Sequence, residues 1–374
     1  MSHMANVYRL GVKELWSLIR DPVMLILIAY SFTLSIYSSA TATPDTLHNA
    51  AIAIVDEDDS PLSRRITSAF YPPQFIQPKL ISINDIDKSL DEGAYTFVLD
   101  IPPNFQRDVL AGSSPEIQLN VDATRMTQAL TGSGYVQQIV SGEITDFLAG
   151  HREQATAPID LAMRMRFNPS LDNTWFGSLM EVINSVTMLS IILTGAALIR
   201  EREHGTIEHL LVMPVTPAEI MLSKVWSMGF VVLLAAALSL MFVVQGALAV
   251  PIEGSIALFL VGASLHLFAT TSMGIFMATI ARSMPQFGLL LMLTLLPLQL
   301  LSGGMTPRES MPELVQNVML LAPTTHFVIL GQAILYRGAG LNVVWPQMLA
   351  LAVIGSILFT ISLLRFRKTL SQMG

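Results

Sequence analysis

The chain has 374 residues, of which 52% are apolar and 13% are charged, and it contains no cysteine. This composition and a mean hydropathy of +0.55 are typical of a protein whose main solvent is the bilayer, and they exclude a single large soluble core. The formal net charge of −7 is unevenly distributed: residues 45–173 hold 18 acidic and 9 basic residues, so the remainder carries a net charge of +2.

The chain begins with an amphipathic stretch, residues 5–21, that we expect to form a helix lying flat on the inner membrane surface. Its apolar residues are Val7, Leu10, Leu15, Trp16 and Leu18, and they stand among Arg9, Lys13 and Glu14. Asp21-Pro22 then turns the chain into the first span, residues 22–43. A plain cytoplasmic extension of that span is the alternative for this stretch.

Six apolar stretches are predicted to cross the membrane, because a transmembrane helix needs roughly 20 mostly apolar residues. They are residues 23–40, 179–199, 225–250, 256–281, 287–302 and 347–364. Basic residues stand before the first stretch, after the second, after the fourth and after the sixth, and basic loops favour the cytoplasmic side. The sequence therefore predicts a multi-pass membrane protein with both termini in the cytoplasm.

Residues 44–173, between the first two spans, have the pattern of an α/β domain, which this orientation places in the periplasm. We expect strands at residues 51–55, 95–101 and 116–121 and a long helix at 126–148. Ser60-Pro61 has the form of a helix start, with proline at the first helical position. Without disulfides, this domain has to be held together by its own apolar core.

Residues 303–338 follow the fifth span and are too apolar for a free loop. Gly303-Gly304 ends the span, and two short amphipathic pieces follow at residues 312–321 and 325–336. Each piece is too short to cross the bilayer. We expect a helical hairpin that enters the outer leaflet and leaves on the same side. Residues 174–374 therefore form a five-helix membrane region that includes this re-entrant hairpin.

The stretch REREHGTIEHLLVMPVTP, residues 200–217, is a dense group of charged and turn residues between two apolar runs. Gly205 permits a turn, residues 207–213 have amphipathic helical spacing, and Pro214 and Pro217 close the stretch. A docking helix for a cytoplasmic partner and a solvated loop both fit this pattern. Metal binding by His204, Glu208 and His209 is a third reading, but the spacing without cysteine is a weak metal signal.

Several motifs resemble the membrane subunits of type-2 ABC exporters that have a large periplasmic domain. They are RFNPSLDNTWF, the stretch from LIREREHGTIEHLL to MLSKVW, and IVDEDDSPLSRR, IPPNFQRDVLAG and VDAT in the external domain. The resemblance covers residues 7–370. It implies six spans with an interfacial amino-terminal helix, a coupling helix within residues 201–217, and a dimer of such subunits with two ATPase subunits.

On this resemblance, the candidate residues for contact with the ATPase lie in the coupling stretch. They are Glu201, Arg202, Glu203, His204, Gly205, Thr206, Glu208, Met213 and Pro214. The chain has no G-x-x-x-x-G-K-[ST] loop, so ATP and Mg²⁺ are expected on a separate ATP-binding subunit. No nucleophile elbow, HExxH pair or catalytic triad is visible, and we expect neither an enzyme, nor a metal or cofactor site, nor a nucleic-acid partner.

Polar residues within spans are costly and suggest function. Glu181 and Asn184 share a helix face in the second span, and Pro297 bends the fifth span beside Gln299. In the resembling family these two spans face each other across the dimer. The resulting candidates for a transport path or gate are Glu181, Asn184, Met188, Leu189, Ile192, Leu296, Pro297 and Gln299. For His266, with Thr270 four residues on, a proton relay and an interhelical hydrogen bond are the alternatives.

The function expected from these features is that of an ABC exporter permease. Its cargo would be hydrophobic or amphipathic small molecules, such as drug-like compounds or lipids. It would form a homodimer or pair with a similar permease, and a periplasmic adaptor and an outer-membrane channel are further possible partners. A membrane receptor or scaffold and a proton-coupled secondary transporter are the alternatives, although the latter lacks visible inverted repeats.

Overall fold

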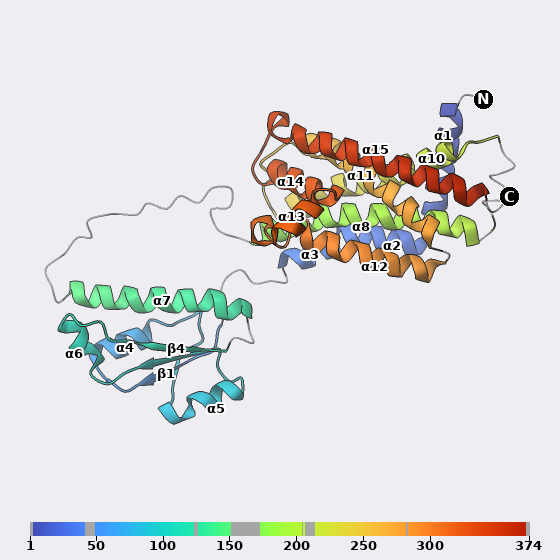
Figure 1. The fold of residues 1–374 in the computed structure, drawn as a ribbon. Coiled ribbons are helices and arrows are strands. Elements are labelled where there is room, and N and C mark those ends of the chain that lie inside the picture. The colour runs from blue at the N-terminus through green and yellow to red at the C-terminus, as the bar shows by residue number, and fades with distance from the viewer. Residues whose placement is uncertain are drawn as a thin grey trace. The chain divides into compact units, whose positions relative to one another are not determined.

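The computed structural model describes residues 3–41, 49–122, 126–150, 173–203, 205, 214–281 and 283–371. The chain divides into two compact units, which are described separately. One consists of Met1–Thr43 with Met165–Gly374 and is helical (Figure 1). The other is Pro44–Arg164 and contains a sheet.

The helical unit contains six candidate membrane spans among its described residues, which agrees with the number predicted from the sequence. The first span is formed by α2 (Pro22–Phe32) and α3 (Leu34–Thr41), which meet at a break at Thr33. The others are α8 (Asn173–Glu203), α10 (Pro217–Leu238) with the π-helical η2 (Ser239–Ala247), α11 (Ile256–Ile280), α12 (Met284–Leu301) and α15 (Leu341–Ser371). Several spans begin earlier than predicted, because caps and prolines rather than hydropathy set where they start. At α10, for example, Thr216 and Glu219 form a capping box around Pro217.

Helix α8 lies at the centre of the helical unit and packs against α3, α10, α11 and α12. In its most apolar window 83% of the residues are buried, against 11% in the window of α12. Helix α12 lies beside α8 (Figure 1) and, in this single chain, buries only Phe287 and Leu295. The two helices that carry the predicted path residues are therefore neighbours, but α8 is mostly buried and α12 is mostly not.

The amino-terminal helix α1 (His3–Ile19) packs on α10. Gly11 makes this possible, because a Cβ at that position would lie 2.2 Å from the Trp226 ring. Trp226 Nε1 donates a hydrogen bond to the Val7 carbonyl at 3.1 Å. Glu14 and Leu18 are buried, whereas Tyr8 and Trp16 are exposed. The amphipathic helix thus buries one face against protein.

After α12 the chain forms η3 (Arg308–Ser310) and two short helices, α13 (Glu313–Met319) and α14 (Pro323–Leu335). The axes of α13 and α14 differ by 89°, which is the geometry of a broken span or a re-entrant loop. Most of α14 is buried against α11 and α15. Protein therefore shields it, as a helix that only partly crosses the membrane requires.

The second unit contains a four-stranded sheet in the order β2-β1-β3-β4. The strands are β1 (Ile52–Asp56), β2 (Lys79–Leu80), β3 (Phe97–Ile101) and β4 (Gln118–Val121). Strand β1 pairs in parallel with β2 and β3, and β4 is antiparallel to β3. The strands predicted near residues 51, 95 and 116 are present. Strand β2 was not predicted, because two exposed residues carry no alternating pattern.

Helices cover both faces of this sheet. On one face α4 (Pro61–Ser68), α6 (Phe105–Leu110) and α7 (Met126–Ala149) form a core with Ile54, Phe97 and Leu99. On the other face α5 (Ile86–Asp91), preceded by η1 (Ile83–Asp85), packs on Val55 and Val98. The alternation along β1 and β3 sorts these side chains between the two faces. The α/β unit thus has an apolar core of its own.

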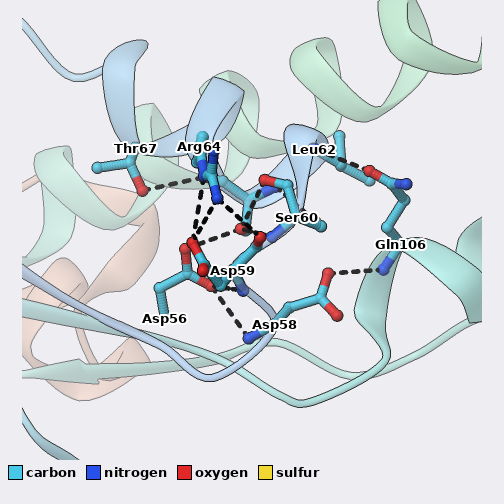
Figure 2. Close-up of polar contacts among 9 residues, drawn as sticks. Asp56, Asp58, Asp59, Ser60, Leu62, Arg64, Thr67 and Gln106 are labelled. Carbon is cyan, nitrogen blue, oxygen red and sulfur yellow. Dashed lines mark hydrogen bonds and ion pairs between the residues drawn. The ribbon is translucent and has the colours of Figure 1, made fainter.

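The acidic turn after β1 is held by hydrogen bonds within the turn and to α6 (Figure 2). Asp56 accepts from the backbone N–H groups of Asp58 and Asp59 at 3.1 and 2.9 Å. Asp58 accepts from the N–H of Gln106 at 3.0 Å, and Asp59 pairs with Arg64 at 2.9 Å. Three of its carboxylates therefore stabilise the turn and the start of α4.

Candidate coupling and transport site

Four consecutive residues at the carboxyl end of α8 each contact a different part of the helical unit. Arg200 forms an ion pair with Asp21, the residue that caps the amino end of α2. Glu201 Oε2 lies 2.7 Å from Lys224 Nζ on α10. These two contacts attach the end of α8 to the first and third spans.

The next two residues bind the turn between α11 and α12. Arg202 donates hydrogen bonds from its guanidinium to the carbonyls of Ala281 and Ala278 at 2.6 and 2.9 Å. Glu203 Oε1 accepts from the N–H of Met284 at 3.1 Å. The positively charged Arg202 thus contacts the carboxyl end of α11, and the negatively charged Glu203 contacts the amino end of α12. Both contacts match the helix dipoles and satisfy backbone groups that helix ends leave unpaired.

Lys224 is at the centre of a group of four charges, two of each sign. Its side chain is 1% exposed, and its Nζ lies 3.0 Å from Glu14 Oε1 on α1 as well as close to Glu201. Lys13 completes the group with a contact of 2.8 Å to Glu201. Burial raises the pKa of the Glu14 carboxyl, while the Lys224 ammonium acts in the opposite direction. The amino-terminal helix is therefore fixed by charge pairing to the same end of α8.

The predicted coupling stretch, residues 201–217, begins within these contacts, and its remainder leaves α8 after Glu203. Gly205 has φ +68°, a left-handed conformation that glycine adopts without steric cost, and it ends the helix as predicted. Residue 204 and residues 206–213 lie outside the described residues. The short helix, the roles of His204, Thr206, Glu208 and Met213, and the metal reading with His209 therefore stay predictions. Pro214 is exposed where the chain is described again.

The path residues predicted on α8 form a stripe along that helix. Glu181, Asn184, Met188 and Ile192 are partly exposed, at spacings of three and four residues. The positions between them are buried, including Leu189, which does not join the stripe. Glu181 is also not free, since its Oε1 accepts a hydrogen bond of 2.6 Å from Ser35 on α3.

The path residues predicted on α12 lie at the surface of the chain. Leu296 is 55% exposed, and Gln299 is partly exposed. Pro297 lies inside the helix, where it cannot donate to the carbonyl four residues earlier. Phe287 anchors α12 on α8, because its ring lies where a side chain at Gly195 would be. The structure therefore places the α12 candidates on a helix that packs directly beside the α8 stripe.

His266 takes part in a polar contact between α11 and α8. Its Nε2 lies 2.9 Å from Thr187 Oγ1, and its ring stacks on Phe327 with 4.1 Å between ring centroids. Thr270, four residues on, donates to the backbone carbonyl of His266 at 3.0 Å and accepts a hydrogen bond of 2.7 Å from Ser190. His266 is 0% exposed. This geometry is that of the interhelical hydrogen bond, the second of the two alternatives.

The sequence reasoning missed the pairing of Lys224 with Glu14. Glu14 was noted as part of the amphipathic stretch, and Lys224 stands in the quoted motif MLSKVW. The available signal was the position of Lys224 in the apolar run IMLSKVW, since a charge in such a run needs a partner.

The α/β unit also contains an unpredicted cavity of about 740 Å³ between α7 and the sheet. Apolar residues, serines and Gln137 line it, and none of its lining side chains is charged.

Six apolar helices, with charged contacts joining the end of α8 to its neighbours, define a multi-pass integral membrane protein. The chain belongs to the ABC-2 family of transporter proteins: residues 15–364 match the family described as ABC-2 family transporter protein. Membership indicates a transport permease rather than an enzyme, and it implies an ATP-binding partner subunit.

Curated relatives match over most or all of the chain. Inner membrane transport permease YhhJ of Escherichia coli (strain K12) is 62% identical over 374 residues, which is 100% of both chains. Probable multidrug ABC transporter permease YbhR of the same strain is 28% identical over 360 residues, 95% of this chain and 96% of the relative. Probable multidrug ABC transporter permease YbhS is 27% identical over 346 residues, 89% of each.

Proposed function

We propose that this chain is the membrane subunit of an ATP-driven exporter that moves hydrophobic or amphipathic small molecules outward across the bacterial inner membrane. The observation that carries the proposal is the set of contacts made by residues 200–203. Residues 201–203 open the stretch expected to meet the ATP-binding subunit, and the rest of that stretch follows them directly. A displacement of that stretch would therefore act at once on α2, α10 and the α11–α12 turn.

The proposed orientation puts both termini and residues 201–217 in the cytoplasm and the α/β unit in the periplasm. It is supported by the distribution of Lys and Arg, because basic residues surround the inner ends of the spans. The α/β unit would be the part that meets a periplasmic adaptor leading to an outer-membrane channel.

The proposed transport path lies between two permease subunits. Its walls would be the partly exposed stripe on α8 and the exposed side of α12, with Pro297 and Gln299 near the outer gate. This arrangement is supported by the exposure pattern of α8, because the other residues between positions 178 and 199 are buried. The names of two relatives mention multidrug transport, which favours apolar cargo of varied shape.

The coupling role is tested by purifying the chain together with its ATP-binding subunit and measuring substrate-stimulated ATP turnover. Gly205→Trp should lower stimulation by roughly 5- to 150-fold, the range of ordinary coupling free energies. Gly142→Trp is the matched control, because Gly142 is exposed on α7 and a Cβ there meets nothing within 4 Å. Glu203→Ala, with Glu313→Ala as its control, tests the contact to α12.

The proposal fails if the ATP-binding subunit does not bind the chain, or if Gly205→Trp leaves stimulation unchanged. Transport that persists without ATP and collapses with the proton gradient would support the secondary transporter instead. An α/β unit that binds a protein while the purified complex moves no cargo would support the receptor or scaffold.

A further inference from the structure

A pocket of about 450 Å³ lies at the end of the helical unit remote from residues 200–203. It is formed where α12 ends, with one wall from the start of α8 and another from α14 and the residue after Tyr336. Helix α12 begins at the contact with Glu203 and has 18 residues, so its other end lies about 27 Å away along the helix. The pocket is therefore separated from the coupling contacts by the thickness of a membrane core.

Two guanidinium groups line this pocket, together with one carboxylate, from Glu309, and the amide of Gln332. Arg308 Nε is buried and has no hydrogen-bond partner among the described residues. Its Nη2 makes a long contact of 3.4 Å to the Gln316 carbonyl. Within the described part of the chain, no hydrogen bond or ion pair is found for Arg337. The pocket thus has a formal charge of +1 and unused donors.

The position of these two arginines runs against the charge distribution of the rest of the membrane region. They are the only Lys or Arg residues in segment 303–338, which the proposed orientation places at the outer side. Basic residues in short loops favour the inner side, so two of them at the outer end call for a specific reason. A bound anion provides that reason, since guanidinium binds phosphate and carboxylate groups with paired donors.

The surroundings of the pocket fit a molecule that also has an apolar part. Phe176 and Met305 contribute apolar walls, and Phe176 stacks on Tyr336 with 5.8 Å between centroids. Tyrosine is one of the residues enriched where a membrane meets water. Below the pocket, Leu296 and Leu300 are 55% and 49% exposed on α12 and continue an apolar surface into the membrane.

We propose that this pocket binds the phosphate headgroup of an anionic amphipathic molecule, with Arg308 and Arg337 on the phosphate and the apolar chain lying along α12. Gly303 contributes to the site, because the Arg308 side chain lies so near that a Cβ at Gly303 would be 3.2 Å from its Cγ. The pocket gives the proposed exporter a preference for anionic amphiphiles at its outer end. Binding itself requires neither ATP nor the partner subunit, so it can fail while the proposed function stands.

The test is native mass spectrometry of the full chain in a neutral detergent, titrated separately with phosphatidylglycerol, phosphatidylcholine and inorganic phosphate. Phosphatidylglycerol should bind with the highest affinity. The variant Arg308→Gln/Arg337→Gln should weaken its tightest site by about tenfold or more, as expected when charge-assisted hydrogen bonds are lost. Arg365→Gln/Arg367→Gln removes the same charge from exposed positions of α15 and should leave that site unchanged.

Single substitutions keep the test valid if the double variant folds poorly. Arg337→Gln should weaken binding more than Arg337→Lys, because lysine keeps the positive charge but loses the paired donors. Arg337 is exposed, so neither change disturbs the core. Equal binding of phosphatidylcholine would overturn the anion site. Inorganic phosphate that binds as tightly as phosphatidylglycerol would overturn the amphiphile, and an equal loss in the α15 control would show general attraction to positive charge instead.

Discussion

Lys224 Nζ lies 2.7 Å from Glu201 Oε2, and this contact joins the buried start of α10 to the last turns of α8. Because Glu14 is also within 3.0 Å, two carboxylates depend on one buried ammonium. Removing one partner of a buried ion pair leaves an uncompensated charge, which costs more than the pair contributes. The group is therefore a sensitive point for the attachment of α1 as well as for α8.

Lys224→Met should destabilise the helical unit by about 3–5 kcal/mol, because Glu14 and Glu201 would remain with Lys13 alone. The double variant Lys224→Met/Glu14→Gln lacks one charge of each sign relative to the parent. It should therefore recover much of the lost stability. Thermal unfolding in detergent and the amount recovered from membranes measure both effects. Lys368→Met, at an exposed position of α15, is the control and should change neither quantity. A double variant no more stable than Lys224→Met would contradict this explanation.

The close approach of α8 and α11 depends on a glycine. A Cβ at Gly274 would lie 2.7 Å from the carbonyl oxygen of Ile191, and backbone cannot move aside as a side-chain end can. Small residues allow such contacts between membrane helices. Gly274→Ala should therefore cost about 1–3 kcal/mol of stability, the usual range for overpacking.

The matched control for that substitution is Gly288→Ala on α12, where a Cβ meets nothing within 4 Å. Alanine favours helix over glycine by up to about 1 kcal/mol, so this variant should be as stable as the parent or slightly more stable. Thermal unfolding of the two purified variants gives the comparison. If both alanines shift the transition equally, the close contact between α8 and α11 is not what limits stability.

The partly buried Asp100 on β3 should make the stability of the α/β unit depend on pH. Burial raises the pKa of its carboxyl, and Oδ1 has no hydrogen-bond partner among the described residues. The folded chain therefore binds this proton more tightly than the unfolded chain, so the stability that Asp100 contributes is fully present below the unfolded pKa and lost as pH rises through the folded pKa. Asp100→Asn should raise the unfolding temperature of the α/β unit slightly at pH 7.

The gain from Asp100→Asn should shrink as the pH falls and disappear near the ordinary carboxyl pKa of 3.8. Scanning calorimetry of the full chain between pH 4 and pH 7 measures this dependence. Asp91→Asn, at an exposed position in α5, should show no such trend. A gain independent of pH would mean that the carboxyl charge is not its cause.

A feature of this structure could be predicted from the sequence when its signal lies within a few neighbouring residues. Six spans, the helix that starts at Ser60-Pro61 and the turn at Gly205 were predictable, because hydropathy, proline and glycine act over a few residues. The partners of Lys224 were not predictable, since Glu14 lies 210 positions away and only packing brings them together. Strand β2 was not predictable for a different reason. It consists of two residues that pair with one edge of β1, and two residues are too few to show an alternating pattern.

The partly exposed stripe on α8 can be probed by cysteine cross-linking. The chain has no cysteine of its own, so every disulfide that forms comes from an introduced residue. If a second copy covers the stripe, a cysteine at Asn184 or Met188 should form a disulfide between copies when the purified protein is oxidised. Such a bond requires the two Cβ atoms to come within about 4 Å, so it reports direct facing rather than mere proximity.

Leu349→Cys is the control for lipid-facing exposure, because Leu349 is an exposed apolar residue on α15, away from the stripe. It should not cross-link, and Val186→Cys, which is buried within α8, should not react at all. Efficient cross-linking at Leu349 with none at Asn184, Met188 or Ile192 would place the contact between copies on α15. The α8 stripe would then face lipid, and the path between two subunits would have to be sought elsewhere.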